Sequence, residues 1–431
     1  MKLGDILESK SRDFDSACRY YLEAVNLVKE NSKATIALSK AHAKKGDFAS
    51  AHTYLNGLLE SPEKNVVEES TMILADIMCQ QNSFLAASFH FRNIVESNPA
   101  NYEALSRLLD VLKRLDKLDA AQEIFNLIEK KRPRCKIENG FIFCRGLYFR
   151  FCNKVHESMK QFVVCRKDSI WGERASQYLI ELFLNPEDQI VGGEALDSTV
   201  DSSKAAADWN ADSDLVGLMT AEQLIKELDQ NPKSLSTQML ECHALMATKQ
   251  KSEVEKAIAV QMNMLTIDHD YIPAIYGSSV GYMLLKQPPR ARNQLKRAAK
   301  IAWSQEFGDD LEKCWLLLAD IYIQGGKYDL ATELLKKVIL VNRSHPKAYE
   351  YLGFIMEKEA SYADAATHYE QCWKLMRHGN PSIGFKLAFN LLKAKRFVDA
   401  IDVCHKVLAS NPEYPKIKIE ILDKARSQIR C

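Results

Sequence analysis

The chain has 431 residues, of which 46% are hydrophobic and 27% charged, values typical of a folded protein. Its 58 Lys and Arg residues nearly balance its 57 Asp and Glu residues, so the overall charge indicates neither nucleic acid nor a membrane surface as partner. The most apolar candidate span, residues 141–152, is short and interrupted by Arg145 and Arg150. Composition therefore predicts no nucleic-acid binding and no transmembrane segment.

Targeting and cysteine usage both indicate a reducing compartment. Residues 1–15 carry charges throughout and have no apolar core, unlike a secretory signal. The eleven cysteines are scattered, and the densest group, Cys144, Cys152 and Cys165 with His156, has no zinc-module spacing. We expect these residues to pack as small hydrophobic groups in a cytosolic protein.

The first predicted element is the second helix of an incomplete pair. Ala17, Tyr21 and Ala24 have helical spacing, but only about ten residues precede them, too few for a full first helix. We therefore expect the chain to begin inside a repeat, either as part of a longer parent or with a partner covering that end.

A small residue that opens a second helix then recurs along the chain. The intervals lie between 34 and 40 residues, except one of 63. The eleven residues are Ala17, Ala51, Ala87, Ala121, Ser158, Ala221, Ala257, Ala291, Ala331, Ala365 and Ala400. In residues 314–339, Trp315, Leu318, Ala319 and Tyr322 complete the tetratricopeptide pattern, whose period is about 34 residues.

This pattern predicts an all-α fold, a tetratricopeptide-repeat solenoid. Each repeat is a pair of antiparallel helices that cannot bury its apolar face alone, so neighbouring pairs must stack, here into a right-handed superhelix. Residues 1–184 are predicted to hold the N-terminal repeats and residues 218–413 the C-terminal repeats. Residues 414–431 are predicted to form a capping helix with polar outward positions.

The 63-residue interval indicates an insertion at 185–217, between predicted helices at 171–184 and 218–231. Residues 186–214 contain eight acidic residues and one Lys, with few aliphatic residues, so we expect disorder. The segment is either a tolerated surface insertion or an acidic docking strip anchored by its one aromatic residue. The strip would comprise Glu187, Asp188, Glu194, Asp197, Asp201 and Trp209.

Two basic runs are either solvated faces or patches for an acidic partner. Residues 130–136 are expected in a loop between repeats. Residues 286–300 hold six cations and no acidic residue, partly on a predicted second helix. The second run is the candidate partner-binding patch, made of Lys286, Arg290, Arg292, Lys296, Arg297 and Lys300.

Catalytic motifs are nearly absent from the sequence. Residues 277–281 match G-x-S-x-G, but a nucleophile elbow needs a strand before its serine, and Ser279 falls at a small packing position of a repeat. The phosphate-binding, dinucleotide-binding and zinc-protease motifs are missing. We expect no enzyme activity, no cofactor and no metal.

Several stretches go beyond the generic repeat pattern. They are residues 184–194, 245–252, 290–297, 315–324, 347–359 and 414–426. These stretches resemble the C-terminal part of the tetratricopeptide repeat protein 21 family, the large repeat subunit of intraflagellar transport complex A. The resemblance implies a non-enzymatic scaffold for retrograde transport and ciliary cargo trafficking. Its partners would be other complex A subunits, which are WD-repeat or helical-repeat chains, and its location the cytoplasm and the cilium, at the axoneme and ciliary base.

Two other functions stay open as alternatives. A co-chaperone-type adaptor would bind acidic C-terminal peptides, and the basic run at 286–300 favours it. That adaptor needs Lys and Asn in a clamp on the first helices, where this chain has Met72 with Asp76, Leu316 with Asp320, and Phe385 with Phe389. A hydrolase would depend on Ser279 alone.

Overall fold

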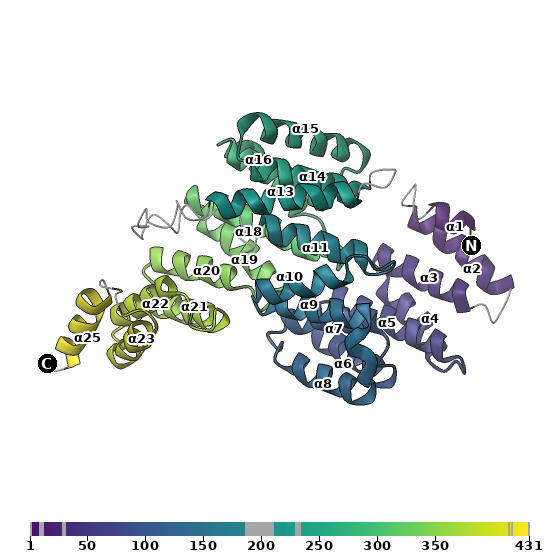
Figure 1. The fold of residues 1–431 in the computed structure, drawn as a ribbon, viewed down its shortest axis with the longest axis horizontal. Helices are drawn as coiled ribbons and strands as arrows, with labels where there is room; N and C mark the ends of the chain where they lie inside the picture. Colours follow the sequence, from purple (N-terminus) through teal and green to yellow (C-terminus); the bar gives the residue numbers. More distant parts are fainter. Residues whose placement is uncertain are drawn as a thin grey trace. The chain divides into compact units, whose positions relative to one another are not determined.

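Every regular element in the part of the chain that the computed structural model describes is a helix. The described residues are 2–7, 13–27, 32–185, 211–228, 234–412, 414 and 417–429. They fall into two compact units, residues 1–165 and 166–431, each a stack of helix pairs (Figure 1). The predicted all-α repeat fold is confirmed.

The first unit ends ahead of the predicted insertion, at Cys165. Its element η2 is a single 3-10 turn. Its helices are α1 (Lys2–Ile6), α2 (Phe14–Leu27), α3 (Ser32–Lys45), α4 (Phe48–Leu59), α5 (Lys64–Gln80), α6 (Phe84–Ser97), α7 (Tyr102–Arg114), α8 (Ala120–Lys131), η2 (Pro133–Ile137), α9 (Asn139–Phe151) and α10 (Val155–Cys165).

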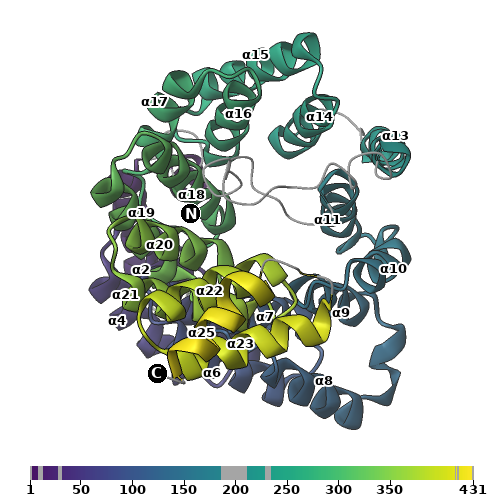
Figure 2. The same cartoon turned by 90° about the vertical axis from the view of Figure 1, so that its left-hand side faces the viewer.

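In the second unit, helix pairs follow one another from α14 and α15 to α22 and α23 (Figure 2). Its element η4 is a π-helical turn. The helices are α11 (Gly172–Leu184), α13 (Ala211–Leu228), α14 (Leu235–Ala247), α15 (Lys251–Ile267), α16 (Ile272–Leu284), α17 (Pro288–Ala298), α18 (Gly308–Gln324), α19 (Tyr328–Val341), α20 (Pro346–Lys358), α21 (Tyr362–Leu375), α22 (Pro381–Lys393), α23 (Phe397–Ser410), η4 (Lys418–Leu422) and α25 (Asp423–Ile429).

The recurring small residue is fully buried in every pair. All eleven side chains have an exposed fraction of 0%: Ala17, Ala51, Ala87, Ala121, Ser158, Ala221, Ala257, Ala291, Ala331, Ala365 and Ala400. The distance between packed helices depends on the side chains at their contact, so a methyl group at this place lets the backbones approach closely. The small-residue series therefore marks helix contacts, as predicted.

In most pairs a large side chain follows four residues after the small one and fills the space inside the pair, whereas Cys404 takes this place after Ala400. Phe162 on α10 and Tyr369 on α21 are 0% exposed and pack against glycines of the preceding helix. A Cβ added at Gly146 would lie 2.7 Å from the Phe162 ring, and one at Gly353 would lie 2.9 Å from the Tyr369 ring. Glycine and aromatic residue thus form one packing unit.

Gln261 is the exception at this apolar position. It is 0% exposed, and neither its Oε1 nor its Nε2 has a hydrogen-bond partner among the described residues. The next two pairs have Leu295 and Leu335 at the equivalent place, both 0% exposed. A buried amide without partners loses its hydration and gains no hydrogen bond in return, so Gln261 destabilises its pair.

We expect Gln261→Leu to raise the free energy of unfolding by about 1–3 kcal/mol, because it removes an unpaired buried amide. Urea denaturation followed by circular dichroism measures the change. Gln122→Leu, at an exposed position of the second helix α8, is the matched control and should stay within about 0.5 kcal/mol of the parent. An unchanged or lower stability of Gln261→Leu would contradict the account.

Most first helices end in a residue with a left-handed backbone. Glycine takes this conformation after α3 and α18, where Gly46 has φ 89° and Gly326 has φ 68°. Residues with side chains adopt the same conformation two residues after other first helices: Asn82, Asp116, Asn153, Lys249, Lys286, Ala360 and Lys395. Stacking of the pairs fixes this turn even where no glycine relieves it.

The predicted boundaries of the insertion need a correction. Helix α13 begins at Ala211, so residues 211–217 of the predicted disordered segment are helical. Sequence reasoning counted the acidic residues 212 and 214 toward disorder. A Cβ added at Gly217 would lie 2.9 Å from the carbonyl oxygen of Phe183, so glycine permits the close approach of α13 to α11.

The predicted C-terminal cap is helical over residues 417–429, as η4 and α25. Ile417, Ile421, Leu422 and Ala425 are buried, and Ile417, Ile421 and Leu422 belong to the same apolar cluster as side chains of α22 and α23. Most outward positions of the segment are polar, with the exposed Ile419 as an exception. The segment therefore covers the last pair, as a solenoid end requires.

Candidate protein-binding surface

The basic run at 286–300 is displayed by helix α17. Pro288 and Pro289 begin this helix, where proline is favoured because its missing N–H has no intrahelical partner. Ala291, Leu295 and Ala298 form the buried side of α17. The same spacing leaves the lysines of the run exposed to solvent.

A groove of about 430 Å³ lies where α17, α18 and α19 meet. Its apolar residues include Leu318, Tyr322 and Leu334, which are nearly buried, and Leu330, which is 44% exposed. Lys296, Arg297 and Lys300 line it from the end of α17 and the following turn, and Glu333 lines it from α19. The groove thus combines apolar side chains with three cations and one carboxylate.

The structure brings together half of the predicted basic patch. Lys296, Arg297 and Lys300 share the groove, whereas Lys286, Arg290 and Arg292 lie outside its lining. The guanidinium of Arg290 lies 5.9 Å from the centroid of the Tyr282 ring. Lys286 occupies the left-handed turn before α17. The six cations therefore do not act as a single patch.

Arg297 has a structural contact as well as a place in the groove. Its Nη2 donates to the carbonyl oxygen of His269, in the turn before α16, whereas its Nε is buried with no hydrogen-bond partner among the described residues. The guanidinium is therefore held at the groove with one donor unused. A cation near the end of α17 also suits the partial negative charge of a helix C-terminus.

The second basic run, residues 130–136, differs from its prediction as a loop. It comprises the end of α8 and the 3-10 turn η2. Lys131 Nζ donates to Glu96 O at 2.6 Å, Arg132 Nη2 to Glu138 Oε1 at 2.6 Å, and Lys136 pairs with Glu129 at 2.9 Å. Several of its cations therefore connect helices.

The acidic docking strip predicted within the insertion lies outside the described residues. This applies to all its members, Glu187, Asp188, Glu194, Asp197, Asp201 and Trp209. The strip stays a prediction.

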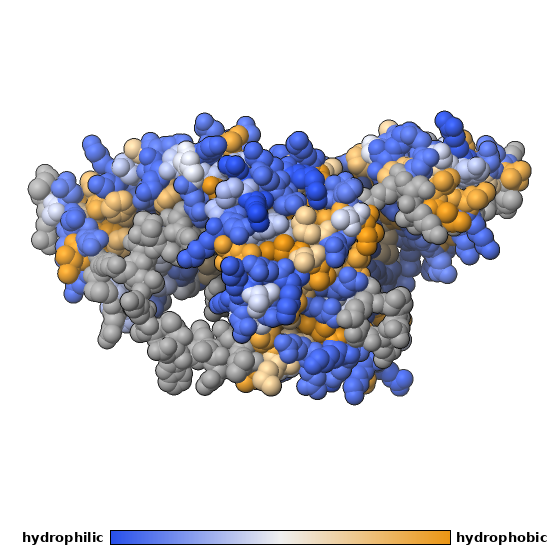
Figure 3. Space-filling model, turned by 90° about the horizontal axis from the view of Figure 1, so that it is seen from above, coloured by the Kyte–Doolittle hydropathy of each residue, from blue (hydrophilic) through white to orange (hydrophobic). Residues whose placement is uncertain are grey.

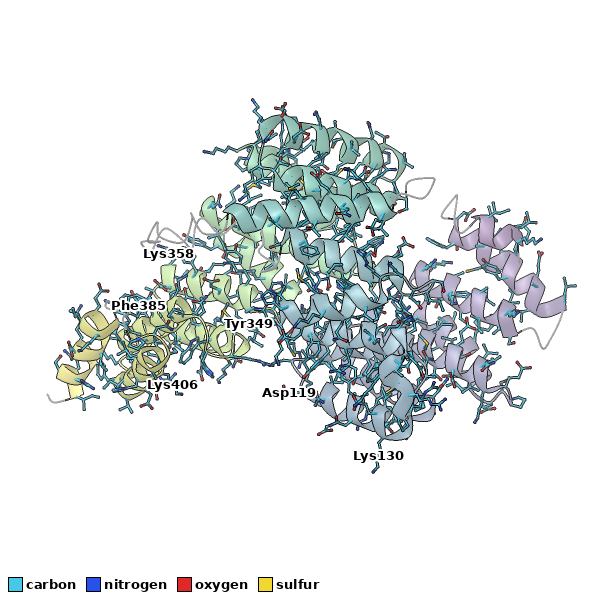
Figure 4. All side chains as sticks on the ribbon, in the orientation of Figure 1. Asp119, Lys130, Tyr349, Lys358, Phe385 and Lys406 are labelled. Carbon is cyan, nitrogen blue, oxygen red and sulfur yellow. The ribbon has the colours of Figure 1, made fainter. Side chains whose placement is uncertain are left out.

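Buried polar side chains connect the first helices of successive pairs. Glu350 on α20 accepts from Lys386 Nζ of α22 at 2.9 Å and pairs with Lys347 at 3.1 Å. Glu357, also on α20, accepts from Asn390 Nδ2 of α22 at 3.0 Å. Figure 4 places Tyr349 and Lys358 on α20 and Phe385 on the neighbouring α22. We call these cross-pair contacts between first helices the polar ladder.

The polar ladder also joins first helices elsewhere in the chain, through two contacts that share one sequence distance. Arg107 Nη1 donates to both carboxylate oxygens of Asp76 at 2.7 Å, and Tyr351 Oη donates to Asp320 Oδ1 at 3.0 Å. Each partner lies 31 residues after its acid. The co-chaperone-type peptide clamp needs Lys or Asn at the positions of Asp76 and Asp320. In this chain the two aspartates instead accept hydrogen bonds from the first helix of the next pair.

Sequence reasoning missed the polar ladder, although the sequence carries a signal for it. The sequence pattern marked Asp76 and Asp320 only as residues that differ from the Lys and Asn of a peptide clamp. A search for a donor 31 residues after each acid, about one turn of helix short of the repeat period, finds Arg107 and Tyr351.

Ser279, Cys144 and Cys165, considered above for catalysis or metal binding, are buried packing residues. Ser279 is fully buried inside helix α16, and its Oγ donates to the carbonyl oxygen of Ile275 at 2.7 Å, so no strand-to-helix elbow exists there. Cys144 and Cys165 are also fully buried. Among the described residues, no three His, Cys, Asp or Glu side chains gather as metal ligands would. Nor does that part of the chain contain a helix of the length and apolarity that a bilayer span requires.

We expect Lys386→Met to lower the free energy of unfolding by about 3–5 kcal/mol, because it leaves Glu350 buried beside fewer charges. The side chains of Lys386 and Glu350 are only 10% and 12% exposed. Lys347→Met removes the more exposed partner and should cost about 1 kcal/mol or less. Equal losses for the two variants in urea denaturation would contradict the buried ladder.

The pH dependence of this pair has a defined sign. Burial raises the pKa of Glu350, but Lys386 and Lys347 outweigh burial and hold that pKa below its ordinary value of 4.5. The paired Glu350 carboxylate therefore stabilises the fold above about pH 4.5. This contribution is lost as the pH falls through the lower pKa that Glu350 has in the folded state. The stability difference between the parent and Lys386→Met should narrow as the pH is lowered from 7 to 4.

Comparison with known proteins places the chain in a family. Residues 220–426 match the model of the tetratricopeptide repeat protein 21 C-terminal ARM domain, and residues 68–184 match that of the TT21 fifth ARM repeats domain.

Among curated relatives, the chain is 42% identical over 423 residues to tetratricopeptide repeat protein 21B of Xenopus laevis. It is 43% identical over 421 residues to tetratricopeptide repeat protein 21A of Mus musculus. Each alignment covers 97% of this chain and 32% of the relative, so the chain spans about a third of the length of these relatives.

Among solved structures, a chain of the APC/C hetero-tetramer Cut9–Hcn1 has a TM-score of 0.45 and 11% identity, covering 98% of this chain and 88% of that one. This likeness is too weak to carry a functional argument. The two family models, together with relatives aligned along nearly the whole chain, show that the chain belongs to the tetratricopeptide repeat protein 21 family.

Proposed function

We propose that the chain is a non-catalytic scaffold of intraflagellar transport complex A. In this role it holds other complex A subunits, which are WD-repeat or helical-repeat proteins, during retrograde transport and the delivery of cargo into cilia. The observation that carries the proposal is the alignment of 97% of the chain with members of the tetratricopeptide repeat protein 21 family.

The fold supports a role in binding proteins. Stacked helix pairs offer an extended surface that large partners can contact. The polar ladder holds the first helices in register, so less order has to be gained on binding. On the face seen in Figure 3, hydrophilic residues predominate and apolar residues reach the surface between them. Such a mixed surface is typical of non-obligate protein interfaces.

The proposed location follows from the proposed role. A complex A scaffold works in the cytoplasm, at the ciliary base and along the axoneme. The adaptor alternative receives less support, because Asp76 and Asp320 occupy clamp positions and already accept hydrogen bonds from neighbouring pairs.

Affinity purification of the tagged chain from ciliated cells tests the proposal. Quantitative mass spectrometry should recover other complex A subunits above the level found with an equally tagged, unrelated tetratricopeptide protein. Imaging of the same tagged chain should show signal at the ciliary base and along the axoneme. Recovery of no complex A subunit, together with a monodisperse monomer in size-exclusion chromatography, would overturn it.

A further inference from the structure

We infer that the groove between α17, α18 and α19 binds an internal acidic peptide segment of a partner protein, with an aliphatic side chain seated on the groove floor. The inference rests on the proposed scaffold function, since it names one kind of partner that the scaffold would take. It is carried by the size of the groove, its apolar floor and its charges.

The size and floor of the groove suit a side chain with a few flanking residues. A volume of about 430 Å³ lies in the range of sites that enclose part of a ligand. Leu318, Tyr322 and Leu334 are between 1% and 8% exposed and hold the floor in place, and Leu330 extends it toward solvent. An aliphatic side chain placed there would leave water for a surface that is already formed.

The cations of the groove set the charge of the ligand. Among the described residues, neither Lys296 nor Lys300 forms an ion pair, and the basic run around them contains no acidic residue. Arg297 adds a third positive charge to the lining of the groove, where its Nη2 donates to the carbonyl oxygen of His269. Carboxylates of a bound peptide would supply the complementary charges on this side.

Glu333 gives the lining of the groove one negative charge beside its three cations. It is exposed on α19 across from the lysines and would repel a segment that is acidic on both sides. A peptide can present carboxylates to α17 and an amide or ammonium group to α19. The headgroups of an anionic lipid surface carry no aliphatic side chain that could sit on the floor of the groove, so the apolar floor favours a peptide.

Selection from a phage-displayed library of random twelve-residue peptides on the immobilised full chain tests the inference. The enriched peptides should carry at least two acidic residues beside Leu, Ile or Met. The peptide enriched most strongly is then synthesised with blocked ends, which excludes binding through a terminal carboxylate. Its Kd is measured by isothermal titration calorimetry.

The variants define the site. Lys296→Glu with Lys300→Glu should weaken the Kd by about tenfold or more, and Leu330→Ser should weaken it independently of charge. Lys286→Glu removes a cation of the same run outside the groove and should change the Kd by less than about twofold. Circular dichroism and thermal unfolding of each variant verify that the fold is kept.

Three outcomes would overturn the inference. They are no enrichment of acidic peptides, a Kd unchanged by the double substitution, and binding of the chain to phosphatidylserine vesicles through these lysines without peptide enrichment. Recovery of complex A subunits from cells would leave the proposed function standing in each case. Acidic-peptide binding without complex A recovery would instead contradict the proposed function alone.

Discussion

Close contact at one buried small side chain holds the two helices of each pair together, and the rest of the structure depends on it. Every second helix has Ala or Ser at this place with no exposed surface. The large side chain that follows then reaches into the space between helices, as Tyr369 does against Gly353. Because no pair buries its apolar face alone, stability arises from nearest-neighbour contacts along each unit.

The polar ladder adds specificity to this apolar stacking. Apolar contacts tolerate small shifts of one helix along another, whereas the hydrogen bonds of Asp76 to Arg107 and of Glu350 to Lys386 fix one alignment. Polar side chains of successive first helices thereby satisfy one another's hydrogen bonds. Lys296 at the end of α17 and Lys300 in the turn after it take no part in the ladder, and they line the groove proposed for a partner.

The repeat fold could be predicted because its signals are local and periodic. The spacing of Ala331 and Ala365 located second helices, and the interval of 63 residues located the insertion. The start of α13 at Ala211 was missed, because its acidic residues resemble those of a disordered segment when the contact of Gly217 with α11 is unknown. Likewise the left-handed Ala360 has no sequence signal, since stacking imposes its conformation.

The candidate site was predicted only in part, for a geometric reason. Sequence indicated six cations in one run, but Lys286 lies in the turn before α17 and Arg290 lies over the Tyr282 ring, so neither lines the groove. The floor comes from α18 and α19, whose Leu318 and Leu334 are read in the sequence as ordinary repeat residues. The ladder was missed because a single repeat, taken alone, does not show which side chain of the next repeat its acid meets.

Hydrogen–deuterium exchange on the chain carrying Ala365→Leu tests most directly whether packing at this contact stabilises its own pair and, through the shared apolar cluster, the next one. Overpacking the fully buried Ala365 should cost about 1–3 kcal/mol. The account predicts that amide protection falls in α20, α21 and α22, and that α14 and α15 keep theirs. An even loss of protection across residues 166–431, or none in the helices next to Ala365, would contradict it.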